Sequence, residues 1–221
     1  APLHGDLLMP AGASRVPAMV FLPGSDVSSY RTNYARLVNE VLTPLFADMG
    51  YAILYVDKRG VGRSGGVWFE ADFAKRAEDA RVAMRFLAAE SRIELGRLVV
   101  VGHSQGGWIA QMLAGDPSPP FRVISLAGPT VGVWEQAIDD EAGGLVCEGT
   151  PVADALKRAT EVMSEVREAS RTATRGRLRQ FALIAEHRPD DALRRAQAPI
   201  LLVFGGNDRL VPPERNLSRL R

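Results

Sequence analysis

Short apolar runs alternate with amphipathic segments along most of the chain. Four of the runs are almost continuously apolar, which is typical of strands buried on both faces of a parallel sheet. The pattern therefore predicts a mostly parallel sheet flanked by helices. The predicted strands are Leu7–Met9, Ala18–Leu22, Ala52–Val56, Leu98–Val101, Val123–Leu126 and Ile200–Phe204.

Two segments between these runs have the period of an α-helix. One segment ends at Gly50, and we expect Thr43 to cap its final turns because Pro44 is tolerated only in the first turn of a helix. The order of strands and helices predicts right-handed βαβ units and an α/β fold. In the other segment, one apolar stripe is formed by Phe73, Ala77, Ala80, Met84 and Leu87.

The stretch from about residue 134 to residue 195 lacks strand patterns. We interpret it as a helical insertion that could act as a lid over the edge of the sheet. The chain is then a single domain over residues 1–221, with a core of residues 1–133 and 196–221. Its clearest helical period is formed by Val152, Leu156, Ala159, Met163 and Val166.

The segment Gly102-His103-Ser104-Gln105-Gly106 joins an apolar strand to a helical pattern. A nucleophilic serine in such a setting stands on a sharp turn above the sheet. Gly102 and Gly106 lack a Cβ, so the strand and the helix can approach closely. The helix N-terminus offers free N–H groups where an oxyanion would develop. A bare Gly-x-Ser-x-Gly pattern is weak, but this placement predicts that Ser104 is a nucleophile.

The loop Pro23-Gly24-Ser25-Asp26 follows an early strand and is the second candidate part of the site. A serine on a strand–helix turn is commonly served by an N–H group from such a loop. Gly24 would let the backbone turn toward the serine. We expect the main-chain N–H groups of Ser25 and Gln105 to form an oxyanion hole, which typically stabilises a tetrahedral intermediate by several kcal/mol.

With these residues placed, the chain resembles the α/β-hydrolase superfamily, and most of all bacterial esterases related to prolyl oligopeptidase and dienelactone hydrolase. The resemblance covers roughly residues 1–135 and 196–217. It implies an α/β-hydrolase fold and serine hydrolase chemistry, and it says little about the substrate. It rests on residues 50–64 with their Asp-x-Arg-Gly-x-Gly-x-Ser loop, on Gly102–Gly107, on Leu126–Pro129 and on Leu202–Pro212.

The chain departs from the family at the oxyanion loop. Family members usually carry His-Gly there, whereas this chain has Pro23-Gly24. The backbone donor survives the change, but the support from the histidine side chain is lost. Asp57 in the family's loop is interpreted as a structural residue that accepts hydrogen bonds from backbone N–H groups.

The catalytic triad of these enzymes runs in the order serine, acid, histidine. Asp208 follows an apolar strand and is the predicted acid, which would orient the histidine. No histidine follows Asp208 in this sequence. His4 precedes the sheet, His103 should point away from the catalytic position, and His187 lies in the insertion, out of family order. We therefore expect that the sequence stops before a last strand, a last helix and the catalytic histidine.

Composition adds few constraints. Lys plus Arg number 27 and Asp plus Glu 26, a net charge of +1, which does not favour nucleic acid or an anionic membrane as a partner. The apolar runs are too short to span a bilayer. Cys147 is the only cysteine, so an internal disulfide is excluded. No histidine and carboxylate cluster has metal-ligand spacing, and we expect no cofactor.

Four arginines in the insertion are a further candidate binding feature. Arg171, Arg175 and Arg179 are spaced by four on a predicted helix, with Arg177 nearby. They could bind an acidic group of a substrate, or form a solvated face together with neighbouring glutamates.

The sequence thus predicts a carboxylic ester hydrolase that acts on a small-molecule ester through an acyl-enzyme on Ser104. Two alternatives stay open. A peptidase or an acyltransferase could use the same triad, and a non-catalytic binding module could have kept the fold and lost its base. The sequence does not decide between a cytoplasmic protein and one exported after removal of a signal peptide.

Overall fold

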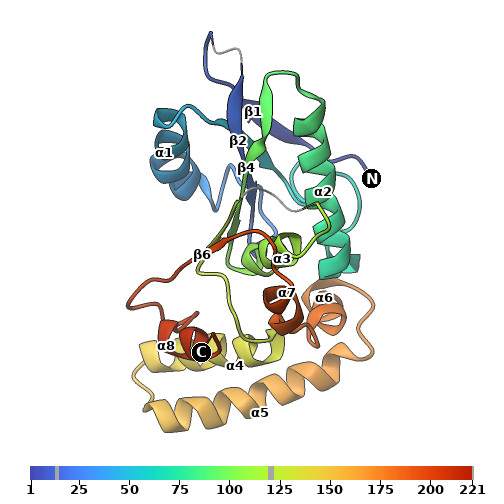
Figure 1. The fold of residues 1–221 in the computed structure, drawn as a ribbon. Helices are drawn as coiled ribbons and strands as arrows, with labels where there is room; N and C mark the ends of the chain where they lie inside the picture. The colour runs from blue at the N-terminus through green and yellow to red at the C-terminus, as the bar shows by residue number, and fades with distance from the viewer. Residues whose placement is uncertain (13–14, 119–121, 221) are drawn as a thin grey trace.

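A computed structural model describes residues 1–12, 15–118 and 122–220 of the chain. Within these residues, one mixed sheet with the strand order β1-β3-β2-β4-β5-β6 forms the centre of the molecule (Figure 1). Strand β1 runs antiparallel to β3, and all other neighbours are parallel. The strands are β1 (Gly5–Leu8), β2 (Val16–Leu22), β3 (Ala52–Val56), β4 (Ile93–His103), β5 (Arg122–Leu126) and β6 (Ile200–Val203).

Each predicted apolar run overlaps a strand, although β1 begins earlier than predicted, at Gly5, and ends at Leu8 rather than Met9. β3 has its predicted bounds, whereas β4 is longer than its apolar run because it begins at Ile93, and β6 ends before Phe204. Every residue of β2 is buried, as expected of a central strand covered on both faces. The mostly parallel sheet predicted from the sequence is confirmed.

Helices cover both faces of the sheet (Figure 1). On one face, α2 and α3 pack on side chains such as Val20 and Val100. On the other face, η1 and α1 pack on Phe21 and Tyr55. The alternation of strand side chains thus forms two apolar layers. The helices are η1 (Leu37–Leu42, a π-helix), α1 (Thr43–Asp48), η2 (Trp68–Glu70, 3₁₀), α2 (Phe73–Ala89), α3 (Gln105–Ala114), α4 (Val133–Cys147), α5 (Val152–Ser170), α6 (Gly176–Ile184), α7 (Asp190–Arg194) and α8 (Pro213–Ser218).

Thr43 does not cap α1, contrary to the sequence-based prediction. The π-helix η1 runs directly into α1, so Leu42 and Thr43 both have helical backbone angles. The Thr43 hydroxyl instead lies 2.8 Å from the hydroxyl of Tyr55. Pro44 does lie in the first turn of α1, where its missing N–H leaves no bond unmade. Gly50 has a φ of 76°, as expected of a glycine that ends a helix.

Helices α4 to α7 form the predicted insertion between β5 and β6, and they gather with α8 at one end of the sheet (Figure 1). The predicted apolar stripe of α5 is wrong at its first positions, because Val152 and Leu156 are 62% and 38% exposed. Ala159 of the predicted stripe is buried, as is Ala155 outside it, and both pack against Ala142 of α4. Small side chains therefore set the contact between these two helices.

One part of the sheet is less covered than the rest. Leu201 and Val203 of β6 are 57% and 41% exposed. They line an apolar groove of about 650 Å³ together with Leu126 of β5, Leu45 of α1 and Met49, which follows α1. Within the described residues, β6 pairs with β5 alone. Strand β6 thus has one unpaired edge, and the face of the sheet that carries Leu201 and Val203 is not fully covered there.

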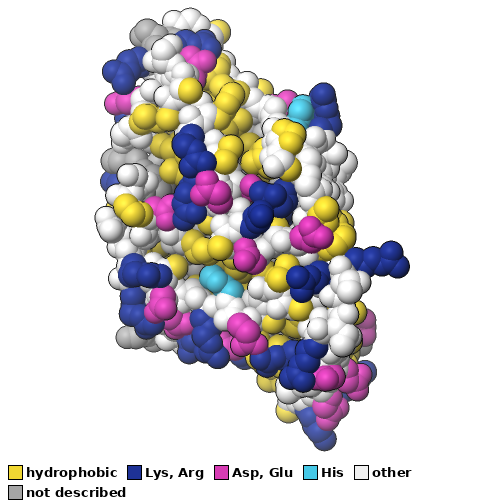
Figure 2. All heavy atoms as spheres, turned by 90° about the vertical axis from the view of Figure 1, so that its right-hand side faces the viewer, with side chains coloured by type: hydrophobic (Ala, Val, Ile, Leu, Met, Phe, Trp, Pro, Cys, Tyr) yellow, Lys and Arg dark blue, Asp and Glu magenta, His cyan; other side chains and the backbone are white. Residues whose placement is uncertain are grey.

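The surface carries charges of both signs. Basic and acidic side chains are interspersed on the face drawn in Figure 2, in keeping with the small net charge. No helix in the described part of the chain is both long enough and apolar enough to span a bilayer. Cys147 is exposed as a free thiol.

Candidate active site

Ser104 occupies a sharp turn between β4 and α3. Its φ of 51° lies in the left-handed region, where a non-glycine residue is strained. The Ser104 N–H donates to the Leu126 carbonyl at 2.9 Å, and the Ser104 carbonyl accepts from the Gly107 N–H at 2.7 Å. These bonds tie the turn to β5 and to α3. The strand–turn–helix arrangement predicted from the sequence is present.

Two glycines allow this turn to form. A Cβ on Gly102 would overlap the backbone of Gly106 and lie 2.9 Å from the Cβ of Ala110. A Cβ on Gly106 would overlap the backbone of Leu22 and lie 2.9 Å from the Pro23 carbonyl oxygen. Real Cβ atoms do not approach backbone so closely, so both positions require glycine. The ends of β2 and β4 and the start of α3 therefore converge on one point.

The loop after β2 passes directly beside the nucleophile turn. A Cβ on Gly24 would come within 3.0 Å of the Ser104 Cβ. Within the described residues, the N–H groups of Ser25 and Gln105 donate to no other protein atom. Both groups are thus available for a ligand, as the sequence-based prediction requires.

A cavity of about 460 Å³ brings the predicted site residues together. Ser25, Ser104, Gln105 and Asp208 all line it, although they come from distant parts of the sequence. The core supplies one side of the cavity and the insertion supplies the other. Its apolar wall includes Trp108, Val133, Phe181 and Ile184.

Asp208 lies in the loop between β6 and α8. One oxygen, Oδ1, accepts from the N–H groups of Leu210 and Val211 at 3.0 and 2.9 Å. The same loop is fastened to α4, because the Gln136 side chain donates to the Leu210 carbonyl. A side chain of α8 adds a second tie, since Asn216 accepts from the Thr130 N–H at 2.7 Å. The loop thus holds the Asp208 carboxylate at the cavity.

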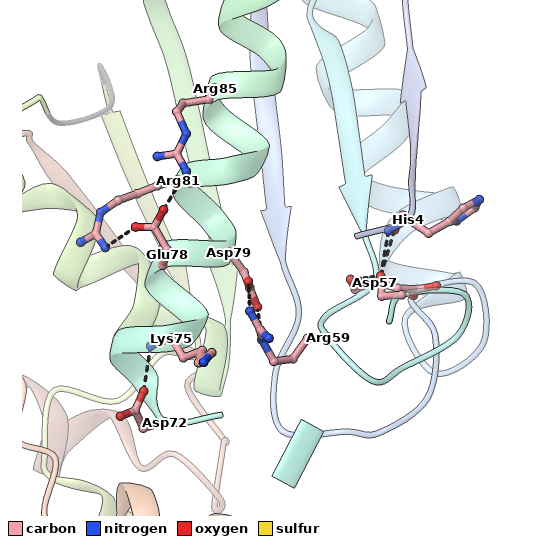
Figure 3. A network of polar contacts seen from close by, with 10 residues as sticks. His4, Asp57, Arg59, Asp72, Lys75, Glu78, Asp79, Arg81 and Arg85 are labelled. Carbon is pink, nitrogen blue, oxygen red and sulfur yellow. Dashed lines mark hydrogen bonds and ion pairs between the residues drawn. The ribbon is translucent and has the colours of Figure 1, made fainter. Parts of the chain in front are cut away.

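In the described part of the chain, no histidine side chain is hydrogen-bonded to Ser104 or Asp208. His4 lies beside the loop after β3 (Figure 3), outside the cavity lining. His187 packs edge-on against Phe73 at 4.8 Å, and burial lowers its pKa to about 4. His103 is among the residues that line the cavity, and its ring packs edge-on against Tyr34 at 5.5 Å. Within the described residues, its ring forms no hydrogen bond with Ser104 or Asp208.

Two further charged side chains face the cavity. Asp140 of α4 is exposed to the cavity, yet it is surrounded closely enough that desolvation, with Asp208 and Asp139 nearby, raises its pKa to about 6. Arg177 of α6 also lines the cavity. A substrate would therefore meet the carboxyl group of Asp140 and the guanidinium group of Arg177, in addition to Asp208, beside the apolar side chains of the wall.

The remaining arginines of the insertion do not share one helix face, contrary to the sequence-based interpretation. Arg171 follows the end of α5, and Arg175 precedes α6. Arg171 pairs with Glu168 at 2.6 Å on the surface. The break between the helices separates Arg171 from Arg177, so the cluster is not a single binding surface.

Three polar side chains behind the oxyanion loop were not predicted from the sequence. Tyr34, Lys58 and Arg76 are 8%, 8% and 6% exposed, and each bonds the loop backbone. One signal was available: Arg76 stands on the buried side of the predicted α2 stripe, next to Ala77. Asp57 was interpreted correctly, because it accepts from the Tyr30 N–H at 3.0 Å.

Comparison with known proteins places the chain in a family. The family profile described as serine aminopeptidase, S33, matches residues 31–220. A monoacylglycerol lipase of Mycolicibacterium smegmatis is 30% identical over 182 residues, which are 76% of this chain and 64% of that protein. The match therefore spans slightly less than two thirds of the length of this curated relative.

Solved structures show the same fold. The α/β hydrolase GrgF from Penicillium sp. sh18 superposes with a TM-score of 0.66 at 17% identity, over 100% of this chain and 86% of that chain. Est1E from Butyrivibrio proteoclasticus, solved with ferulic acid, has a TM-score of 0.66 at 18% identity, over 98% and 80% of the two chains. With the fold, the serine turn and the match over residues 31–220 in agreement, the chain belongs to the serine aminopeptidase S33 family of the α/β-hydrolase superfamily.

Proposed function

We propose that the protein is a carboxylic ester hydrolase that forms an acyl-enzyme on Ser104. The observation that carries the proposal is the position of Ser104, on a strained turn in the wall of a cavity that it shares with Ser25, Gln105 and Asp208. Strain at a non-glycine residue persists only where the surrounding structure enforces it, and it is concentrated at active sites.

In this mechanism, the Ser104 hydroxyl attacks the carbonyl carbon of the ester and a histidine takes its proton. The carbonyl oxygen becomes an oxyanion and accepts hydrogen bonds from the N–H groups of Ser25 and Gln105. The alcohol leaves with a proton returned by the histidine, and water then releases the acid in the same way. Asp208 orients the histidine and stabilises its charged form.

The proposal needs a base that the described residues do not supply near Asp208. We infer that a histidine reaches Asp208 from a further strand and helix beyond residue 221. Two observations support this: β6 has one paired edge, and the apolar side chains of Leu201 and Val203 are exposed beside α1. A strand beside β6 and a helix over this groove would cover them.

Ester chemistry is favoured by the relative named monoacylglycerol lipase and by the apolar cavity wall. The family description names an aminopeptidase, so cleavage of a peptide bond is the second candidate. It is favoured by one observation, the carboxyl group of Asp140 in the cavity, which could meet a substrate ammonium group. A small-molecule substrate fits either reaction.

The test is labelling with a fluorophosphonate, followed by peptide mapping and by a panel of p-nitrophenyl esters and amino-acid p-nitroanilides. We expect the label on the peptide that contains Ser104, and faster reaction with esters than with anilides. Ser104→Ala should take up no label. Unchanged labelling of that variant would refute the proposal, and a preference for anilides would favour the peptidase. A folded protein that neither labels nor turns over would favour a non-catalytic binding module.

A further inference from the structure

The oxyanion loop is held from behind by three buried polar side chains that come from three different elements. Tyr34 lies in the segment before η1, Lys58 follows β3, and Arg76 lies on α2. All three are buried. In the family, a histidine in the loop itself usually gives this support, and here Pro23 stands in its place.

The bonds of these side chains account for almost every polar backbone group of two consecutive peptides. In the Pro23–Gly24 peptide, the carbonyl accepts from Arg76 at 2.7 Å and the N–H donates to the Tyr34 hydroxyl at 2.7 Å. In the Gly24–Ser25 peptide, the carbonyl accepts from Lys58 Nζ at 2.9 Å. The one group left, within the described residues, is the Ser25 N–H.

The geometry of a trans peptide relates the orientation of the Ser25 N–H to that of the Gly24 carbonyl. No peptide bond of the described chain is cis, and in a trans peptide the C=O and N–H bonds point in opposite directions. Ser25 lines the cavity and Lys58 does not. Because Lys58 holds the Gly24 carbonyl, the Ser25 N–H points away from Lys58, which is the direction that an oxyanion donor requires. The bond from Lys58 also polarises the amide, which makes its N–H a better donor.

We propose that Lys58 is a positioning residue, which fixes the Gly24–Ser25 peptide so that the Ser25 N–H serves as an oxyanion donor. The Lys58 amine acts through the peptide and touches no reacting atom. Arg76 supports the same geometry from the other side, because it also donates to the side chain of Gln105, whose N–H is the second expected donor. This inference rests on the proposed function of Ser104.

Lys58 itself is fixed by its two neighbours in the chain. Asp57 accepts from the Tyr30 N–H at 3.0 Å and from the Ser29 hydroxyl at 3.0 Å. Arg59 donates to Asp79 of α2 at 2.8 Å (Figure 3). The loop after β3 is thus tied to the chain that continues the oxyanion loop and to the helix that carries Arg76.

The bond to Gly24 does not depend on the charge of the lysine. Burial, and then the nearby Arg76 guanidinium, lowers the pKa of Lys58 to about 6. The amine is therefore largely neutral at neutral pH, and a neutral amine still donates a hydrogen bond to a carbonyl. Arg76, with a pKa lowered by burial to about 10, stays charged behind the site.

The test compares Lys58→Met, which keeps most of the apolar part of the side chain and removes its donor, with Lys75→Met at an exposed lysine of α2. The rate of Ser104 acylation is measured with p-nitrophenyl acetate and with its thiono analogue, whose sulfur accepts hydrogen bonds poorly. We expect Lys58→Met to slow acylation by the ester on the order of 10²-fold and by the thionoester far less. Lys75→Met should change neither rate.

The ratio of the two rates separates positioning from a merely structural role, because a general loss of structure would slow both substrates equally. A ratio equal to that of the parent in folded Lys58→Met would overturn the inference. If Lys58→Met does not fold, the same ratio is measured on Lys58→Leu, whose side chain also lacks a donor for the Gly24 carbonyl.

A crystal structure of the variant makes failure of the inference distinguishable from failure of the proposed function. If the parent shows no acylation of Ser104, the proposed function fails and the orientation of the Gly24–Ser25 peptide alone decides the role of Lys58. We expect the Gly24 carbonyl to turn toward the cavity when the amine is removed. Retention of the parent orientation would then contradict the role.

Discussion

The nucleophile side of the cavity lies in the middle of the sheet, whereas the acid side lies at its edge. Ser104 and the oxyanion loop follow β4 and β2, which have paired strands on both sides. Asp208 follows β6, whose side chains alternate between half-buried and exposed. The nucleophile side is therefore held in its conformation by close backbone contacts in the core. The acid side depends on loops and on the insertion.

This difference has a consequence for preorganisation. A strained turn and an oriented peptide need a rigid surrounding, and the centre of a sheet covered on both faces provides one. The acid loop is held by side-chain bonds such as those from Gln136 and Asn216. We expect the oxyanion donors to be correctly oriented even when the general base is absent. The contribution of the donors and that of the base can therefore be measured separately.

The largest effect concerns the base. The 221-residue chain should turn over p-nitrophenyl esters about 10⁴-fold more slowly than a form extended beyond residue 221, since loss of a triad member typically costs that much. The extended form should gain activity as pH rises through a histidine titration. Measurement of kcat/KM on p-nitrophenyl acetate compares the two forms.

Added imidazole offers a second route to the same question, because it can replace a missing base. It should accelerate the reaction at Ser104 in the 221-residue chain. Ser104→Ala serves as the control for direct hydrolysis by imidazole, and circular dichroism must show that the short form is folded. Equal rates in the short and extended forms would mean that His187, His103 or another group is the base.

The second prediction tests how tightly the nucleophile side is packed. Gly106→Ala places a Cβ against the Leu22 backbone, and overpacking of this kind costs roughly 1–3 kcal/mol. The matched control is Gly144→Ala in α4, where an added Cβ meets no atom within 4 Å and should stabilise by about 0.4–1 kcal/mol. Urea denaturation measures both. Equal stabilities of the two variants would contradict the contrast between the regions.

Features that depend on neighbouring residues could be predicted from the sequence, whereas contacts between distant residues could not. The strands, the serine turn and the helical insertion were predictable because each produces a local pattern of period or spacing. Lys58 and Arg76 were not, since their partners Gly24 and Pro23 lie 34 and 53 positions away. The wrong cap at Thr43 has a local cause, because a π-helix before α1 leaves no mark in the apolar pattern.

The smallest predicted effect concerns His187, which joins the insertion to the core. Its folded pKa of about 4 lies below the ordinary value near 6.5, so the unfolded chain binds a proton more readily between these values. The free energy of unfolding should therefore fall as pH is lowered from about 6.5 to 4, by about 1–2 kcal/mol after allowance for partial exposure.

His187→Leu removes this proton uptake, and its stability should depend less on pH over the same range. Urea denaturation at several pH values gives the slope, which is compared between parent and variant so that any change in packing cancels. A slope identical to that of the parent would show that His187 is not held in its neutral form.

The central claim is that Ser104 is already activated for acyl transfer by the turn and the oxyanion donors. The most direct measurement is intact-mass spectrometry of the 221-residue chain incubated with p-nitrophenyl acetate, followed by peptide mapping. We predict slow, stoichiometric addition of one acetyl group to the peptide that contains Ser104 (residues 98–122 after tryptic cleavage), and none in Ser104→Ala. Acetylation at another residue, or none in a chain shown to be folded, would contradict the claim.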